Sequence, residues 1–100
     1  MQPNMKMLQQ MQNRIQKMQQ ELEETTVEGT AGGGAVRVSV NGLRTVQSVK
    51  IDPDAVDPQD IEMLEDMVLA AIQEAMKSAE DLASQKMGAI TGGINIPGLM

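Results

Sequence analysis

Two stretches carry residue types that could bind a ligand, and neither has the complete pattern of such a site. Residues 25–34, TTVEGTAGGG, are glycine-rich, but no Lys-Ser/Thr pair follows and Ala35-Val36 leads into a strand pattern. A nucleotide phosphate loop needs that pair and a following helix. Residues 52–60, DPDAVDPQD, resemble a calcium loop, but the glycine at its sixth position is absent and Met63 stands where a bidentate Glu is needed. We interpret the first stretch as a turn and the second as a turn with a helix cap.

The composition removes the usual catalytic and metal-binding groups. The chain has no Cys and no His, which excludes thiolate sites, disulfides, and the commonest general base and metal ligand. The remaining polar residues show no nucleophile–base arrangement. We therefore expect no enzyme activity, no cofactor and no small-molecule substrate. Without a signal-peptide pattern or a long uncharged apolar run, a cytoplasmic protein with no membrane segment is expected.

The charges are strongly segregated along the chain, although the formal net charge is −6. Residues 1–20 contain Lys6, Arg14 and Lys17 and no acid, whereas residues 52–66 contain seven acids and no base. The net charge argues mildly against a nucleic-acid partner, but the segregation permits a basic surface.

The most strongly patterned element is a long helix predicted from Asp57 to Met87. Asp57 can cap it, Pro58 suits its first position, and Gly88 is a natural stop. One apolar stripe follows its whole length: Ile61, Leu64, Val68, Ala71, Ile72, Ala75, Ala79 and Leu82. At about 1.5 Å per residue the helix is about 45 Å long, which exceeds the width of a globule of this size. Part of it must project or pack against another chain, and the absence of aromatic residues also favours an oligomer, because a monomeric core would be thin.

A second helix is predicted from Asn4 to Glu24. Its apolar residues are spaced by three and four, as in a heptad seam: Leu8, Met11, Ile15, Met18 and Leu22. The run is too short to stand alone, so we expect the helix to lie along another one. Core or dimer packing is the favoured interpretation of the seam; a Met-rich groove for peptides is the alternative.

A small antiparallel sheet is predicted between the helices. Thr25 to Gly34 has the pattern of a short edge strand broken by glycines, and Val36, Val38 and Val40 alternate with polar residues. Asn41-Gly42 is a strong hairpin signal, and Leu43 to Ile51 is the returning strand. Val46 falls on the face opposite Val49 and Ile51, so this strand is either bulged or covered on both sides.

The predicted fold is therefore α+β, with a long helix, a small sheet and a second long helix in a single domain of residues 1–87. Residues 88–100 form a glycine-rich tail that we expect to be flexible unless a partner holds it. The predicted core and dimer residues are Leu8, Met11, Ile15, Met18, Leu22, Val36, Val38, Val40, Leu64, Val68, Ala71, Ile72 and Ala75.

Four segments together resemble the YbaB/EbfC family of bacterial nucleoid-associated DNA-binding proteins. They are the Gln-rich helix from Met5 to Glu24, VRVSVNGLRTVQSVKIDP from Val36 to Pro53, LEDMVLAAIQEAMKSAED from Leu64 to Asp81, and GGINIPGL from Gly92 to Leu99. The resemblance implies an intertwined, tweezer-like homodimer located at the nucleoid. It also implies binding of double-stranded DNA with little sequence preference, altered DNA conformation, and roles in nucleoid organisation, gene regulation and DNA protection.

The resemblance does not assign the DNA-contacting residues, so they are inferred from charge. A projecting first helix would present Lys6, Arg14 and Lys17 near its tip, and Lys77 and Lys86 would add to them if the end of the long helix lies alongside. Arg37, Arg44 and Lys50 form a secondary basic patch, for which a solvated or dimer-facing strand surface is the preferred interpretation. The competing function is a dimeric adaptor that grips another protein through its Met-rich seams and its tail, without binding DNA.

Overall fold

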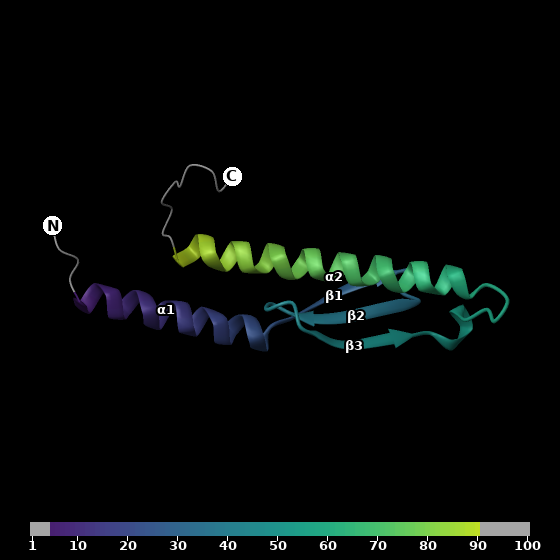
Figure 1. Ribbon diagram of the computed structural model, residues 1–100, viewed down its shortest axis with the longest axis horizontal. Coiled ribbons are helices and arrows are strands. Elements are labelled where there is room, and N and C mark those ends of the chain that lie inside the picture. The colour runs from purple at the N-terminus through teal and green to yellow at the C-terminus, as the bar shows by residue number, and fades with distance from the viewer. Residues whose placement is uncertain (1–4, 91–100) are drawn as a thin grey trace.

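A helix lies across one face of a small sheet, and a second helix extends from the end of that sheet. The computed structural model describes residues 5–90. Its elements are α1 (Met5–Glu24), β1 (Thr26–Ala31), β2 (Val36–Asn41), β3 (Val46–Ile51), the 3-10 turn η1 (Pro53–Ala55) and α2 (Ile61–Ile90). The strands are ordered β1-β2-β3 and both neighbouring pairs are antiparallel. Figure 1 shows α2 over one face of the sheet and α1 beside the far half of α2. The predicted α+β order is confirmed.

Small side chains build the core between α2 and the first two strands. Val36, Val38 and Val40 of β2 are fully buried, and they pack against the fully buried alanines of α2, Ala71, Ala75 and Ala79. Alanines let α2 come close to the sheet, and Gly29 of β1 completes the approach. A Cβ atom at Gly29 would collide with the Ala71 carbonyl oxygen and the Ala75 backbone nitrogen.

The third strand is left uncovered by α2, which packs on β1 and β2. Val49 is opposite Val38 and Ile51 is opposite Val36, so these side chains share the face that carries α2. They nevertheless remain 45% and 39% exposed. A register shift pairs Val40 with Val46, which brings Val46 to the same face, 43% exposed. Of the two alternatives predicted for this strand, a bulge or cover on both sides, the bulge is confirmed. It extends the apolar face of β3.

The hairpin between β2 and β3 is in the predicted place, but its turn is wider than a two-residue Asn-Gly turn. The Asn41 side-chain oxygen accepts hydrogen bonds from the backbone N–H groups of Leu43 (2.9 Å) and Thr45 (3.0 Å), and Arg44 has a φ of 66°. The prediction that the strand starts at Leu43 is wrong, because β3 starts at Val46. Gly42 serves the end of α1 instead: its N–H donates to the Leu22 carbonyl (2.7 Å), and a Cβ atom there would lie 2.8 Å from that oxygen.

Both predicted ends of the long helix are wrong by a few residues. Asp60, not Asp57, caps α2, since its carboxylate accepts the N–H of Met63 at 3.2 Å. The Asp57 carboxylate accepts the N–H of Gln59 at 2.9 Å, which holds the preceding turn. Gly88 does not stop the helix, which continues to Ile90. The rest of the predicted flexible tail, residues 91–100, lies outside the described residues.

The molecule is elongated because α1 projects beyond the sheet and beyond α2. Its extents are 68 × 26 × 16 Å and its radius of gyration is 18.7 Å, against about 13 Å for a compact domain of this length. An ion pair joins Glu21 of α1 to Lys86 of α2. The two helices run in opposite directions (Figure 1), so Ile90, four residues after Lys86, is level with Lys17, four residues before Glu21. We call residues 5–17 of α1, which extend past the end of α2, the arm; it is about 18 Å long at about 1.5 Å per residue.

The predicted apolar seam of α1 is only half covered in the single chain. Met18 and Leu22 are buried, at 8% and 3% exposure, whereas Leu8, Met11 and Ile15 are 44%, 52% and 39% exposed. The first two lie where α2 runs alongside and the other three lie on the arm. Met18 and Leu22 are thus packed within the single chain. Core or dimer packing of Leu8, Met11 and Ile15 stays a prediction, because α2 ends before it reaches them.

Replacing Gly29 with Ala should strongly destabilise the fold. The added methyl group meets backbone atoms of α2, which cannot rotate away as a side chain can. We therefore expect the free energy of unfolding to fall by about 3 kcal/mol, the upper end of the usual cost of overpacking. Urea denaturation followed by circular dichroism measures it. Gly88→Ala is the matched control, since no atom lies within 4 Å of its added Cβ. That helical change should be neutral or slightly stabilising; equal midpoints for the two variants would contradict the close approach.

Candidate nucleic-acid interface

The three predicted arm cations share one side of α1. Lys6, Arg14 and Lys17 are all exposed, and at 3.6 residues per turn they fall within an arc of about 80°. The apolar seam lies roughly 130° around the helix from the centre of that arc. The arm therefore presents a basic side and an apolar side, and the sequence of residues 5–20 contains no acid.

Half of the fourteen acids lie at the opposite end of the molecule. Figure 1 places the start of α1 at one end of the long axis and the η1 region, with the start of α2, at the other. Residues 52–66, which hold seven acids and no base, lie at that second end. Because charges separated by more than a Debye length of about 8 Å are largely screened in physiological salt, the acidic end does not cancel the basic side of the arm.

The two predicted cations of α2 do not join the arm cations equally. The Lys86 ammonium lies 3.1 Å from the Glu21 carboxylate, so it bridges the two helices and its charge is already paired. Lys77 is exposed and lies two residues from both Ala75 and Ala79, on the side of α2 turned away from the sheet. It is also about 14 Å nearer the sheet than Lys86. Neither residue adds an unpaired charge to the arm itself.

The secondary basic patch is interleaved with carboxylates. Arg37 is opposite Lys50 in the sheet, and its guanidinium lies 3.5 Å from the carboxylate of Glu28. Asp52 continues β3 on the same side two residues after Lys50, and its N–H donates to the Ala35 carbonyl at 2.8 Å. Arg44 is in the hairpin turn, about 20 Å along the strand from Lys50. These three cations therefore form no single cluster, which supports the solvated-surface interpretation.

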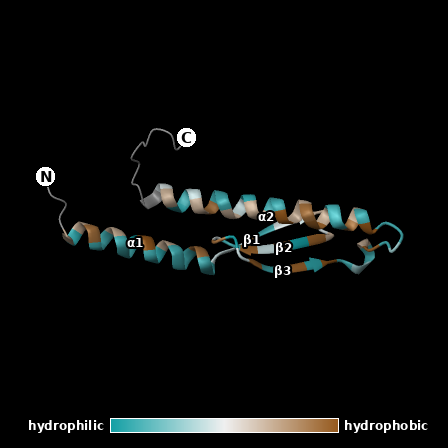
Figure 2. Cartoon of the chain, viewed as in Figure 1, coloured by the Kyte–Doolittle hydropathy of each residue, from teal (hydrophilic) through white to brown (hydrophobic). Residues whose placement is uncertain are grey.

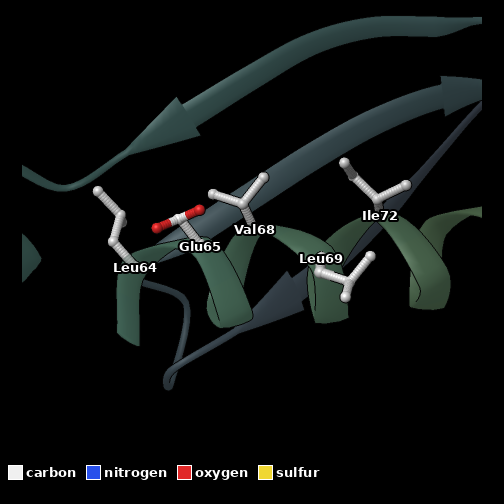
Figure 3. Close-up of a pocket in the computed structure, with 5 residues that line it drawn as sticks. All are labelled: Leu64, Glu65, Val68, Leu69 and Ile72. Atoms are coloured by element: carbon white, nitrogen blue, oxygen red, sulfur yellow. The ribbon is translucent and has the colours of Figure 1, made fainter. Parts of the chain in front are cut away.

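An open apolar groove runs along α2, and the sequence did not single it out as a site. Its lining residues are Leu64, Glu65, Val68, Leu69 and Ile72, and its volume is about 360 Å³. Figure 3 shows Leu64, Val68 and Ile72 projecting from one side of α2 towards the strands. The opposite flank of α2 contacts β1, where the Thr30 N–H donates a hydrogen bond to the Glu74 carboxylate at 3.4 Å. The flank that carries the groove is therefore turned towards the uncovered strand β3. Figure 2 shows apolar residues on both α2 and β3.

Within residues 5–90, no group of three or more carboxylates is placed to hold a metal ion. No helix in the same range is both long and apolar enough to cross a membrane.

Comparison with known proteins gives one consistent family. The model described as the YbaB/EbfC DNA-binding family matches residues 1–94. A nucleoid-associated protein of Pelotomaculum thermopropionicum is 54% identical over 95 residues, covering 95% of this chain and 90% of the relative. A nucleoid-associated protein of Chloroflexus aurantiacus is 54% identical over 90 residues, covering 90% of each chain.

A solved structure has the same fold. The uncharacterized protein HP0035 from Helicobacter pylori superposes with a TM-score of 0.77 at 23% identity, over 86% of this chain and 90% of that one. At that identity the likeness concerns the fold alone.

The Lys86–Glu21 ion pair should contribute little but measurably to stability. Both side chains are partly exposed, at 36% and 43%, so we expect a coupling of at most about 1 kcal/mol that fades in high salt. A double-mutant cycle with Lys86→Gln and Glu21→Gln, followed by urea denaturation, measures it. A coupling of zero at low salt would mean that Lys86 is not held by α1, and would return it to the candidate DNA contacts.

Proposed function

This chain belongs to the YbaB/EbfC DNA-binding family, and from that premise we propose that it is a non-catalytic nucleoid-associated protein whose arm holds duplex DNA by the phosphates. The observation that carries the proposal is the acid-free basic side of the arm, formed by Lys6, Arg14 and Lys17. All three are exposed on a helix that projects from the rest of the chain. Phosphate contacts of this kind fix a protein on DNA without reading its sequence.

The composition of the arm favours backbone recognition over base readout. The chain contains no aromatic residue, so it has no platform for stacking unpaired bases. The other positions of the arm are Gln, Met, Asn, Leu and Ile, and within residues 5–90 no second helix is placed with the arm as a recognition motif. Binding with little sequence preference is therefore expected, located at the nucleoid within the cytoplasm. Two or more arms that bind phosphates at separate points would constrain the path of the duplex. A constrained duplex path supports roles in nucleoid organisation, DNA protection and gene regulation.

A homodimer is the second part of the proposal, supported by two exposed apolar surfaces that lie side by side on the chain. The groove flank of α2 carries Leu64, Val68, Leu69 and Ile72, and the same face of the sheet has an uncovered strand, β3. A second copy could lay its α2 flank over β3 of the first, while the first does the same in return. Such a reciprocal arrangement is the isologous contact of a two-fold dimer. It would supply the larger core that one chain lacks and would double the arms.

Reversing the three arm charges should abolish DNA binding. With two arms, about six cations meet phosphates, so the logarithm of the binding constant should fall with the logarithm of salt concentration with a slope of about −5. The variant K6E/R14E/K17E should give no shift with unrelated duplexes in a gel assay at low salt, and its oligomeric state should be unchanged.

The matched control reverses the secondary patch instead. Arg37→Glu with Lys50→Glu should retain most of the affinity, since those cations alternate with carboxylates. Unchanged DNA binding by the K6E/R14E/K17E variant would contradict the proposal that the arm binds DNA. No DNA binding by the unmodified protein even at low salt would instead favour a protein partner and an adaptor function.

Placing a charge on the uncovered strand should split the dimer. Val49 is 45% exposed in the single chain, so Val49→Asp should leave the chain folded while burying an unpaired carboxylate in the dimer, at a cost of several kcal/mol. Light scattering after size exclusion should then give about half the mass of the unmodified protein. Lys50→Asp, the next residue on the opposite face, is the control and should remain dimeric; a dimeric Val49→Asp protein would contradict this interface.

A further inference from the structure

The apolar seam of α1 is covered only as far as α2 reaches. Met18 is buried, whereas the three seam residues of the arm, Leu8, Met11 and Ile15, are exposed; we call these three the bare seam. The helix α2 ends at Ile90, level with the base of the arm. The bare seam continues the covered part with the same spacing of three and four residues, which is typical of helix-on-helix packing. A second helix is therefore the occupant that fits it.

We propose that the bare seam pairs with the bare seam of another copy, with the two arms antiparallel. On the seam side of the arm, the space from the end of α2 to the tip at Met5 is about 18 Å long, which is the length of one arm. An antiparallel arm fills this space, and the rest of its chain continues past the tip, away from the first copy. Each copy then covers the seam of the other, which is the isologous contact of a two-fold axis.

The position of α2 excludes a parallel pair. In a parallel pair, residues 18–24 of the second copy would lie on the seam side of residues 18–24 of the first. That place is taken by α2, since Met18 is buried there and Lys86 of α2 lies 3.1 Å from Glu21. The antiparallel pair has no such conflict. It also sets the N-terminal end of the second arm towards the C-terminal end of α2, an arrangement in which the two helix dipoles attract.

The charges of the arms do not oppose this pairing. The basic side of each arm lies roughly 130° around the helix from the seam, so it is turned away from the contact. Met7 and Gln12, which flank the bare seam on its two sides, are uncharged. With helix axes about 8–10 Å apart, the cations of one arm lie farther from those of the other than the Debye length of about 8 Å.

The two-fold axis gives the pair one basic face. It turns the basic sides of both arms to the same side of the two-helix layer, so paired arms would offer a duplex a wider row of cations than one arm does. This consequence rests on the proposed DNA binding, whereas the pairing of the seams does not.

A covalent trap tests the pairing without DNA. Three seam side chains from each arm make a small contact compared with the about 1,200–2,000 Å² of a stable interface, so pairs are a minority that a trap detects best. The chain contains no Cys, and Met11 is in the middle of the bare seam, so Met11→Cys sets two thiols close together across the two-fold axis. A short bismaleimide should join these chains at least about ten times faster than it joins the matched control Gln10→Cys, because the pair holds the two thiols near each other. Gln10 is exposed at the same level of the arm, on its basic side. Denaturing gel electrophoresis measures both rates.

Two further variants test the cause and the direction of the pairing. Leu8→Gln with Ile15→Gln, added to Met11→Cys, should lower the rate to that of Gln10→Cys, because the apolar contact is lost. Both residues are exposed in the single chain, and circular dichroism verifies that the fold is kept. An equal mixture of the Leu8→Cys and Ile15→Cys proteins should give mainly the mixed product, because antiparallel arms bring these two positions level with each other.

The rate for Met11→Cys should also rise with protein concentration, because the paired arms belong to separate molecules. Equal rates for Met11→Cys and Gln10→Cys would overturn the proposal. So would mainly like-with-like products in the mixture, which would identify a parallel pair, or a rate that is independent of concentration, which would place both arms in one dimer. Val49→Asp added to Met11→Cys should leave the rate similar, so the result can be read whether or not the proposed dimer or DNA binding holds.

Discussion

The close approach of α2 to the backbone of β1 at Gly29 sets the dimensions of the rest of the fold. It requires glycine on the strand and alanine on the helix, and Ala71, Ala75 and Ala79 are all fully buried. Burying each of the three valines of β2 contributes about 1.5–3 kcal/mol, while each alanine adds far less. The core is therefore narrow, and it is made of small side chains because any larger group at the contact would force α2 off the sheet.

A narrow core has two structural consequences. One helix about 10 Å across covers two strands spaced about 4.8 Å apart but cannot reach the third, so the apolar face of β3 stays open, next to the groove of α2. The 30 residues of α2 are also more than the sheet can hold, so the second half of α2 continues beyond the sheet and provides the surface on which Met18 and Leu22 of α1 are buried. The open strand and the projecting helices thus have a common origin in the small residues of the core.

Sequence patterns predicted most of this fold, since the helices, the alternation of β2 and the hairpin position each depend on local periodicity. They failed where the deciding contact joins distant residues. Gly42 was assigned to a tight turn, but its role is to let the Leu22 carbonyl approach, and nothing near Gly42 in the chain encodes that. Lys86 was placed with the DNA contacts, and only the antiparallel packing of the helices shows that Glu21 pairs with it. Predicting that Lys6, Arg14 and Lys17 share one side of α1 needed no tertiary information, because all three lie on one helix. The absence of acids among residues 5–20 can likewise be read from the sequence.

The same segregation explains how a protein of net charge −6 can meet a polyanion. The first turn of α1 contains no acid, and the positive end of its helix dipole, equivalent to roughly half a charge, lies at the end of the arm. Seven of the fourteen acids lie in residues 52–66, before and at the start of α2. Asp60 caps this helix and Glu62 lies in its first turn, and both stand at the far end of a 68 Å molecule. In the proposed mode of binding, a duplex approaching from that end would meet repulsion, and one approaching the arm would meet attraction. The acidic end would then direct DNA towards the arm, so that the segregation of charge would offset the unfavourable net charge.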